Sequence, residues 1–185
     1  VDWSKGFLFI GRGGEGNGTV IFDNANLTSA SNDASYGIHV SGREKNTNNK
    51  YDGTLIINNS TIVLDYLINK GNMTLDNNST LTVKNGFAIG GRPASETESG
   101  ADATATITLN NGSKVVVNNH NGMGLGYEAI GVMYVNGGST FECTQAFLVT
   151  AKGTLNVNGG EIKIAGNLTN NGTINVGGTV TLNVP

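Results

Sequence analysis

The chain has 185 residues, of which 37% are hydrophobic, and this is enough to bury one core. Only 14% are charged and the formal net charge is -3, so the overall charge gives no attraction to nucleic acid or to anionic lipid. A glycine count of 28 with only 2 prolines, together with abundant Asn and Thr, disfavours helices, collagen and Pro-rich disorder and favours an all-β fold with many tight turns.

A pattern of three short strands recurs along the chain. The first element, at residues 6–10, is predicted to be the last strand of a coil, so we expect the chain to start and to end mid-coil as a fragment of a longer protein. From residue 18 the order is a Gly-Thr strand, an Asn or Gly turn, a second alternating strand and a Gly-bounded third strand. First strands are expected at 18–22, 53–57, 71–75, 106–109, 131–135, 153–157 and 172–176.

The second and third strands fill the rest of each repeat. Second strands carry their larger apolar residues two apart, which predicts one buried face. They are expected at 62–64, 81–83, 115–117, 141–143, 162–164 and 180–182. Third strands are expected at 37–40, 86–89, 122–125 and 146–149, with Leu8, Leu67, Ala88 and Leu148 pointing outward.

Equivalent first-strand residues in the shortest repeats lie about 18 to 19 residues apart, which is room for three strands and three corners but no crossover helix. We therefore predict an all-β fold, a right-handed parallel β-helix of about seven coils with three short strands per coil, as one segment over 1–185. An antiparallel sandwich is the alternative, because Asn-Gly-Gly between alternating strands is also a hairpin signal. The β-helix predicts an inner ladder and stacked Asn corners. The ladder is Val20, Leu55, Met73, Ile107, Met133, Leu155 and Ile174.

The unit Gly-Thr-Leu-Asn-Val-Asn-Gly-Gly at 153–160, repeated in related form at 131–139, resembles the repeats of bacterial autotransporter passengers and adhesin-like surface β-helices. The resemblance covers nearly the whole chain. It implies an exported, extended scaffold on a bacterial surface and transfers no site residues, so candidate sites come from departures from the repeat.

Insertions into the repeat fall mainly after the third strand, at residues 12–17, 43–52, 92–103 and 127–129. A solenoid stacks equivalent corners, so these loops are expected along one edge, where binding residues commonly lie. The three arginines of the chain all begin such loops, and an Arg column can bind carboxylate, sulfate or phosphate groups. The candidate ligand-binding residues are Arg12, Arg43, Arg92, Tyr51, Tyr127 and Glu128. The alternative is that Glu residues in the same loops pair with the arginines and anchor the loops.

The sequence offers no catalytic constellation, so the chain is predicted not to be an enzyme. No carboxylate pair is placed for acid and base chemistry, and neither His39 nor His120 is placed to meet a Ser and an Asp. Cys143 is expected to be a buried hydrophobe on a second strand. No phosphate loop or metal-ligand spacing occurs, and we expect neither cofactor nor metal.

These observations predict a non-catalytic segment of a bacterial cell-surface adhesin, located outside the cell, with a loop-decorated edge that binds glycan or protein on a host or neighbouring cell. A soluble host protein such as an immunoglobulin could bind the same edge. Nucleic acid binding and membrane insertion of this segment are not expected. The alternatives are a purely structural stalk and a polysaccharide-degrading β-helix enzyme.

Overall fold

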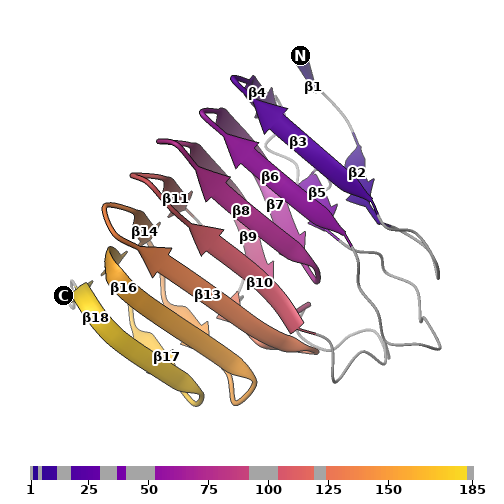
Figure 1. Ribbon diagram of the computed structural model, residues 1–185. Helices are drawn as coiled ribbons and strands as arrows, with labels where there is room; N and C mark the ends of the chain where they lie inside the picture. The colour runs from indigo at the N-terminus through magenta and orange to yellow at the C-terminus, as the bar shows by residue number, and fades with distance from the viewer. Residues whose placement is uncertain are drawn as a thin grey trace.

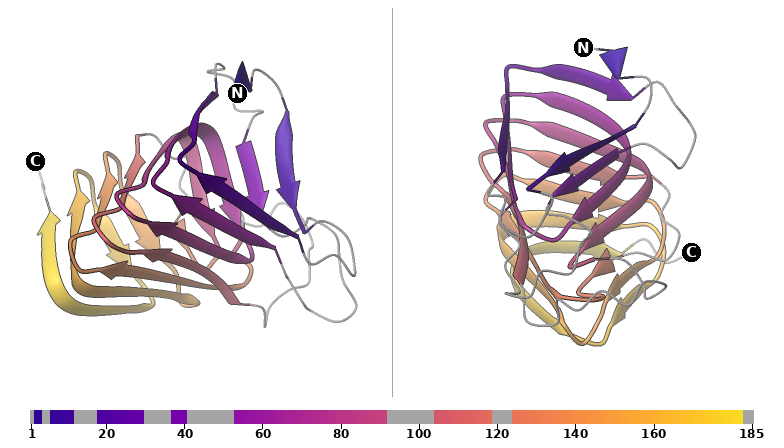
Figure 2. Two further views of the ribbon diagram at one scale, coloured as in Figure 1. Left: turned by 45° about the horizontal axis from the view of Figure 1, so that its top comes forward. Right: turned by 90° about the vertical axis from the view of Figure 1, so that its right-hand side faces the viewer.

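The computed structural model describes residues 2–3, 6–11, 18–29, 37–40, 53–91, 104–118 and 124–182, with residues 2–3 and 182 described by backbone alone. Every strand pairing in these ranges is parallel, and the strands form one continuous solenoid-like sheet. Figure 1 shows the coils stacked side by side from the N-terminus to the C-terminus, and Figure 2 shows the same stack from two other directions. The antiparallel alternative is therefore wrong, and a parallel β-helix-like fold is confirmed.

Three faces make up the solenoid. The first face is the row of broad arrows across the front of Figure 1 and is formed by the predicted first strands. It consists of β3 (Thr19–Asp23), β6 (Thr54–Asn58), β8 (Asn72–Asp76), β10 (Thr104–Leu109), β13 (Ile130–Asn136) and the first parts of β16 (Gly153–Ile164) and β18 (Thr173–Leu182).

The second and third faces complete each coil. The second face contains β1 (Asp2–Trp3), β4 (Asn26–Ser29), β11 (Lys114–Val117), β14 (Thr140–Cys143), the first parts of β7 (Thr61–Asn69) and β9 (Thr80–Ile89), and the second parts of β16 and β18. The third face contains β2 (Phe7–Ile10), β5 (Gly37–Val40), the second parts of β7 and β9, β12 (Gly124–Leu125), β15 (Phe147–Val149) and β17 (Leu168–Asn170).

The predicted inner ladder is confirmed residue by residue. Each member lies opposite the next as a strand partner in the adjacent coil, from Val20 with Leu55 to Leu155 with Ile174. Ladder residues in the middle coils are fully buried, whereas Val20 and Ile174, in the outermost coils, are partly exposed. Each coil therefore buries its apolar side chains against its neighbours above and below.

The turn between the first and second faces carries a ladder of side-chain amides. The Asn58 amide donates to Asp23 Oδ1 at 2.6 Å, and the Asn77 amide donates to Asn58 Oδ1 at 2.6 Å. Further along, the Asn136 amide donates to Asn110 Oδ1 at 2.7 Å. Asn24, Asn59, Asn77, Asn78 and Asn111 adopt left-handed φ angles, which Asn tolerates better than most residues. The predicted stacking of the Asn corners is present.

The prediction of the outward residues on the third face was partly wrong. Leu67 is fully buried in the core, and Leu8 packs against the same core. The register explains this, because Leu8, Ile38, Leu67 and Phe87 form one inward row. Ala88 belongs to a separate buried cluster with Tyr66, outside the main core, and Leu148 is half-buried. Because strand faces alternate with a period of two, a one-residue error in register reverses the assignment.

Candidate binding edge

The corner that follows the third face is a continuous edge, here called the loop edge. Its backbone groups bond from coil to coil at 2.7 to 3.0 Å, so successive corners stack in register. The bonds run from Lys70 N to Val40 O, Gly90 N to Asn69 O, Gly126 N to Ile89 O, Thr150 N to Leu125 O and Asn171 N to Val149 O. This ladder of parallel bonds aligns the ends of the third-face strands from β5 to β17.

The predicted Arg column lies outside the described residues. Arg12, Arg43, Arg92 and Tyr51 are all in segments that the structure does not describe. The residues that flank these segments are described. Val40 and Gly53 bond to the Lys70 and Asn72 amides of the next coil, at 2.8 and 2.9 Å. The two described residues on either side of positions 41–52 therefore both lie at the loop edge, and the ligand contact of Arg43 and Tyr51 stays a prediction.

Lys70 and Glu128 form a buried ion pair at the loop edge. Lys70 Nζ lies 2.8 Å from Glu128 Oε2, and the two side chains are 6% and 11% exposed. The pair crosses the intervening Gly90–Gly91 corner, whose Gly90 carbonyl accepts hydrogen bonds from Glu128 N at 2.8 Å and Ala129 N at 3.0 Å. Breaking such a pair from one side leaves a buried charge uncompensated. The pair thus joins two corners beside the segment that begins at residue 92.

Gly91 makes room for this ion pair. It has a φ of +91°, in the left-handed region, and a Cβ at this position would collide with the Glu128 carboxylate. Only glycine combines that backbone conformation with such close approach of a neighbouring side chain. The conformation that precedes Arg92 is therefore coupled to the placement of Glu128.

Glu128 is also held through its backbone. Lys152 Nζ donates to the Glu128 carbonyl at 2.9 Å, and the Lys152 amide donates to Thr150 Oγ1 at 3.2 Å. Thr150 Oγ1 in turn donates to the Gly126 carbonyl. The predicted site residue Glu128 is thus part of a connected polar network that joins its own corner to the corners of Lys70 and of Lys152, and its role toward a ligand stays a prediction.

Tyr127 packs against the outside of the third face. Its half-buried ring contacts the small cluster of Tyr66 and Ala88, which Phe7 also contacts. Burial raises the pKa of the Tyr127 phenol above its usual value. The ring therefore covers apolar surface beside the loop edge, which is the packing role that a buried aromatic commonly has.

A second polar cluster, at the corner between the second and third faces, was missed by the sequence reasoning. Asp65 is fully buried, accepts a hydrogen bond from Ser29 Oγ at 3.0 Å, and has its Oδ1 3.8 Å from Lys84 Nζ. Lys84 Nζ also donates to the Ser29 carbonyl at 3.1 Å. The spacing of the coils was the feature of the sequence that could have predicted this cluster. Leu64 and Val83 are strand partners, and Asp65 and Lys84 follow them directly.

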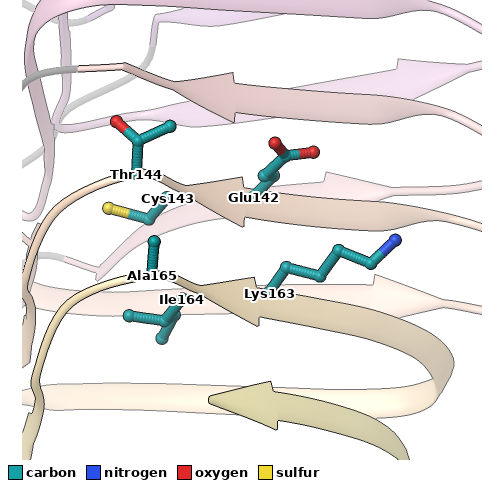
Figure 3. A pocket seen from close by; sticks show the side chains of 6 residues that line it. All are labelled: Glu142, Cys143, Thr144, Lys163, Ile164 and Ala165. Atoms are coloured by element: carbon teal, nitrogen blue, oxygen red, sulfur yellow. The ribbon is translucent and has the colours of Figure 1, made fainter. Parts of the chain in front are cut away.

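A shallow depression of about 100 Å³ lies at the same corner in later coils (Figure 3). It is lined by Glu142, Cys143, Thr144, Lys163, Ile164 and Ala165. Its charged side chains are paired within the molecule, Glu142 with Lys114 at 2.7 Å and Lys163 with Glu161 at 2.9 Å. Cys143 is 1% exposed, as predicted, and burial raises the pKa of its thiol. A protonated, buried thiol is a poor nucleophile.

Within the described ranges, no group of three or more His, Cys, Asp or Glu residues is placed to hold a metal ion. The same ranges contain no helix of the length and apolarity needed to cross a membrane.

Comparisons with models of protein families, with curated proteins and with solved structures find no match to this chain.

Proposed function

We propose that this chain is a segment of a bacterial cell-surface adhesin, exported and similar in kind to autotransporter passengers. In this proposal the solenoid is a right-handed parallel β-helix of about seven coils. Right-handed crossover is the near-universal geometry of parallel strand connections, and the seven-residue inner ladder supports the coil number. The chain acts without catalysis and holds a binding edge on a rigid support.

The observation that carries the proposal is the stacking of the loop edge. The described residues that flank the segments 12–17, 41–52 and 92–103 all lie at this one edge. Backbone hydrogen bonds of 2.8 or 2.9 Å align the coils there, from Thr54 N to Gly18 O, from Asn72 N to Gly53 O and from Thr106 N to Gly71 O. Binding residues are commonly carried on loops that a rigid scaffold gathers. A ligand with repeated acidic groups, on a glycan or on a protein, fits a row of arginines that starts at such an edge.

A structural stalk is the second candidate function, and one observation favours it. The described charges of the loop edge are engaged with one another, since Glu128 pairs with Lys70 and its carbonyl binds Lys152. If Arg12, Arg43 and Arg92 are engaged in the same way, the edge is a spacer and recognition belongs to another protein or segment.

Glycan and protein arrays probed with the intact chain distinguish the two. The adhesin predicts a bound ligand whose signal falls at least about tenfold when Arg43 and Arg92 are both changed to Ala, because each charge-assisted bond contributes more than a neutral one. The matched control changes Lys114 and Lys163 to Ala, which removes the same charge from the second face. Equal loss in both variants, or no ligand at all, contradicts the proposal and favours the stalk.

A further inference from the structure

The first face presents a regular lattice of outward side chains. Strand register places the outward residues in rows that run along the solenoid axis, spaced about 4.8 Å between coils and about 6.7 Å along a strand. The row nearer the loop edge contains Thr19, Thr54, Asn72, Thr106, Val132, Thr154 and Thr173, and the middle row contains Ile21, Ile56, Thr74, Thr108, Tyr134, Asn156 and Asn175. In Figure 1 no described element lies in front of this face.

These two rows carry no charged side chain. The row at the turn contains two carboxylates, Asp23 and Asp76, and each accepts a hydrogen bond from an Asn amide at 2.6 Å. The second face differs, because its outward positions carry charged residues from neighbouring coils, namely Lys84, Lys114, Glu142, Glu161 and Lys163. The two rows of the first face nearest the loop edge are therefore uncharged, in contrast to the second face, and they do not attract an ionic partner.

The hydroxyl groups of the lattice are available to a partner. Within the described part of the chain, the side chains of Thr74, Thr108 and Thr154 make no hydrogen bond, whereas the Asn residues of the turn ladder bond to one another. Each free hydroxyl offers one donor and two acceptor lone pairs. The parallel ladder fixes the backbone beneath them and the β-branched Thr side chain has few χ1 rotamers, so a ligand that binds here has little conformational entropy to remove.

Tyr134 supplies an aromatic ring in the middle of this lattice. It is half-buried, and its strand partners are Thr108 in the preceding coil and Asn156 in the following coil. Along its own strand it lies between the outward residues Val132 and Asn136. A flat amphipathic ring is thus flanked by the Thr108 hydroxyl on one side and by Asn156 on the other. Asn156 Oδ1 accepts from the Asn175 amide at 2.8 Å, so the Asn156 N–H groups are the ones left to a ligand.

We propose that the first face binds an uncharged polysaccharide, with one sugar ring stacked on Tyr134 and neighbouring hydroxyls bonded to Thr108 and Asn156. A pyranose ring has an apolar C–H face and a rim of hydroxyls, which match an aromatic surface with polar groups beside it. An anionic chain gains nothing here, because the two rows offer it no cation. This site is separate from the loop edge and goes beyond the adhesin function proposed above.

Retention of the intact chain on microcrystalline cellulose and on chitin, measured by depletion from solution, tests the proposal. We expect binding to at least one of the two, and an affinity at least about fivefold weaker for Tyr134→Ala because the stacking surface is lost. Thr108→Val removes a hydroxyl and keeps the β-branched shape, so it weakens binding about threefold without disturbing the strand. Thr82→Val on the second face is the matched control and leaves binding unchanged.

Salt and arginine variants separate this site from the loop edge. Binding to the first face persists in about 1 M NaCl, where exposed ionic contacts are screened, and persists when Arg43 and Arg92 are changed to Ala. Three results overturn the proposal: no retention on either polysaccharide, retention that is unchanged in both Tyr134→Ala and Thr108→Val, or retention that disappears in high salt. Circular dichroism of each variant confirms that the coil stack is intact.

Discussion

The Lys70 ammonium lies 2.8 Å from the Glu128 carboxylate, across the Gly90–Gly91 corner and almost out of contact with solvent. Because the two residues follow third-face strands of different coils, their pairing holds together the corners on either side of Gly90–Gly91. The network extends to Lys152 through the Glu128 carbonyl. The loop edge is thus built on a rigid, charge-compensated base.

Breaking the buried pair from one side is expected to destabilise the fold strongly. Lys70→Met should lower the free energy of unfolding by about 3 to 5 kcal/mol, because Glu128 is left as an uncompensated buried charge. Chemical denaturation measures the change. The control is Lys163→Met, which removes the partner of Glu161 in an exposed pair and should leave stability nearly unchanged. Equal effects of the two variants would show that the Lys70–Glu128 pair is solvated.

A side chain at Gly91 should disturb the same pair. Gly91→Ala forces a non-glycine residue into the left-handed region, at about 1 to 2 kcal/mol, and also displaces the Glu128 carboxylate. A double-mutant cycle with Lys70→Met separates the two effects, since the displacement no longer matters once the ion pair is absent. Strict additivity in that cycle would contradict the coupling between Gly91 and the pair.

The burial of Cys143 predicts a penalty for a hydroxyl in its place. Cys143→Ser should lower stability by about 1 to 3 kcal/mol, because the more polar group is buried and its acceptors, the Gln145 and Ala146 carbonyls, lie 3.4 and 4.0 Å from the native sulfur, too far for a good hydroxyl hydrogen bond. Thr140→Ser, at an outward position on the same strand, is the control and should be close to neutral. A neutral effect of Cys143→Ser, measured by urea unfolding, would contradict its inward register.

The raised pKa of the Cys143 thiol predicts a dependence of stability on pH. Burial disfavours the thiolate in the folded state and so raises the pKa of the Cys143 thiol there. Below the usual thiol pKa the group is protonated in both states and the folded protein keeps its full stability. Above that pH the unfolded state ionises first, so the free energy of unfolding falls. The free energy of unfolding of the wild type should therefore fall more steeply above about pH 8.5 than that of Cys143→Ala. Parallel pH profiles would show that the thiol titrates equally in both states.

Removing an Asn from the amide ladder at the turn should destabilise the fold in proportion to the number of hydrogen bonds that the residue makes. Asn58 donates to Asp23 and accepts from Asn77, whereas Asn158 donates to Asn136 alone. Asn58→Ala should therefore destabilise more than Asn158→Ala, with each bond contributing about 0.5 to 1.5 kcal/mol. Thermal unfolding of the two variants checks the order, and the reverse order would contradict a role for the ladder in stacking the coils.

The solenoid could be predicted from the sequence because its signals repeat. A ladder residue such as Met73 or Met133 recurs at a fixed place in the pattern, so each coil confirms the placement of its neighbours. The Asn corners and the burial of Cys143 followed from the same alignment. The third face was harder, because its short Gly-bounded strands have apolar residues at adjacent positions, and Leu8 and Leu67 were assigned to the wrong side.

The polar clusters could not be predicted in the same way. Lys70 and Glu128 lie in corners of different length, so their spacing in sequence carries no periodic signal, and their contact depends on the absence of a side chain at Gly91. Asp65 received no role from the sequence, because Ser29 and Lys84 meet it from the coils on either side. Contacts between coils need the register at each corner, which the strand pattern leaves open.

Cysteine cross-linking between successive coils tests the parallel stack most directly. In a Cys143→Ala background, Thr74→Cys with Thr108→Cys should form a disulfide readily, because these outward strand partners lie in adjacent coils at the distance a disulfide requires. Ile107→Cys with Val116→Cys should not form a disulfide, because in the solenoid these two residues lie on different faces. In an antiparallel hairpin through the turn between them, the same two residues would lie opposite each other and would cross-link. Cross-linking of the second pair and not the first would contradict the solenoid.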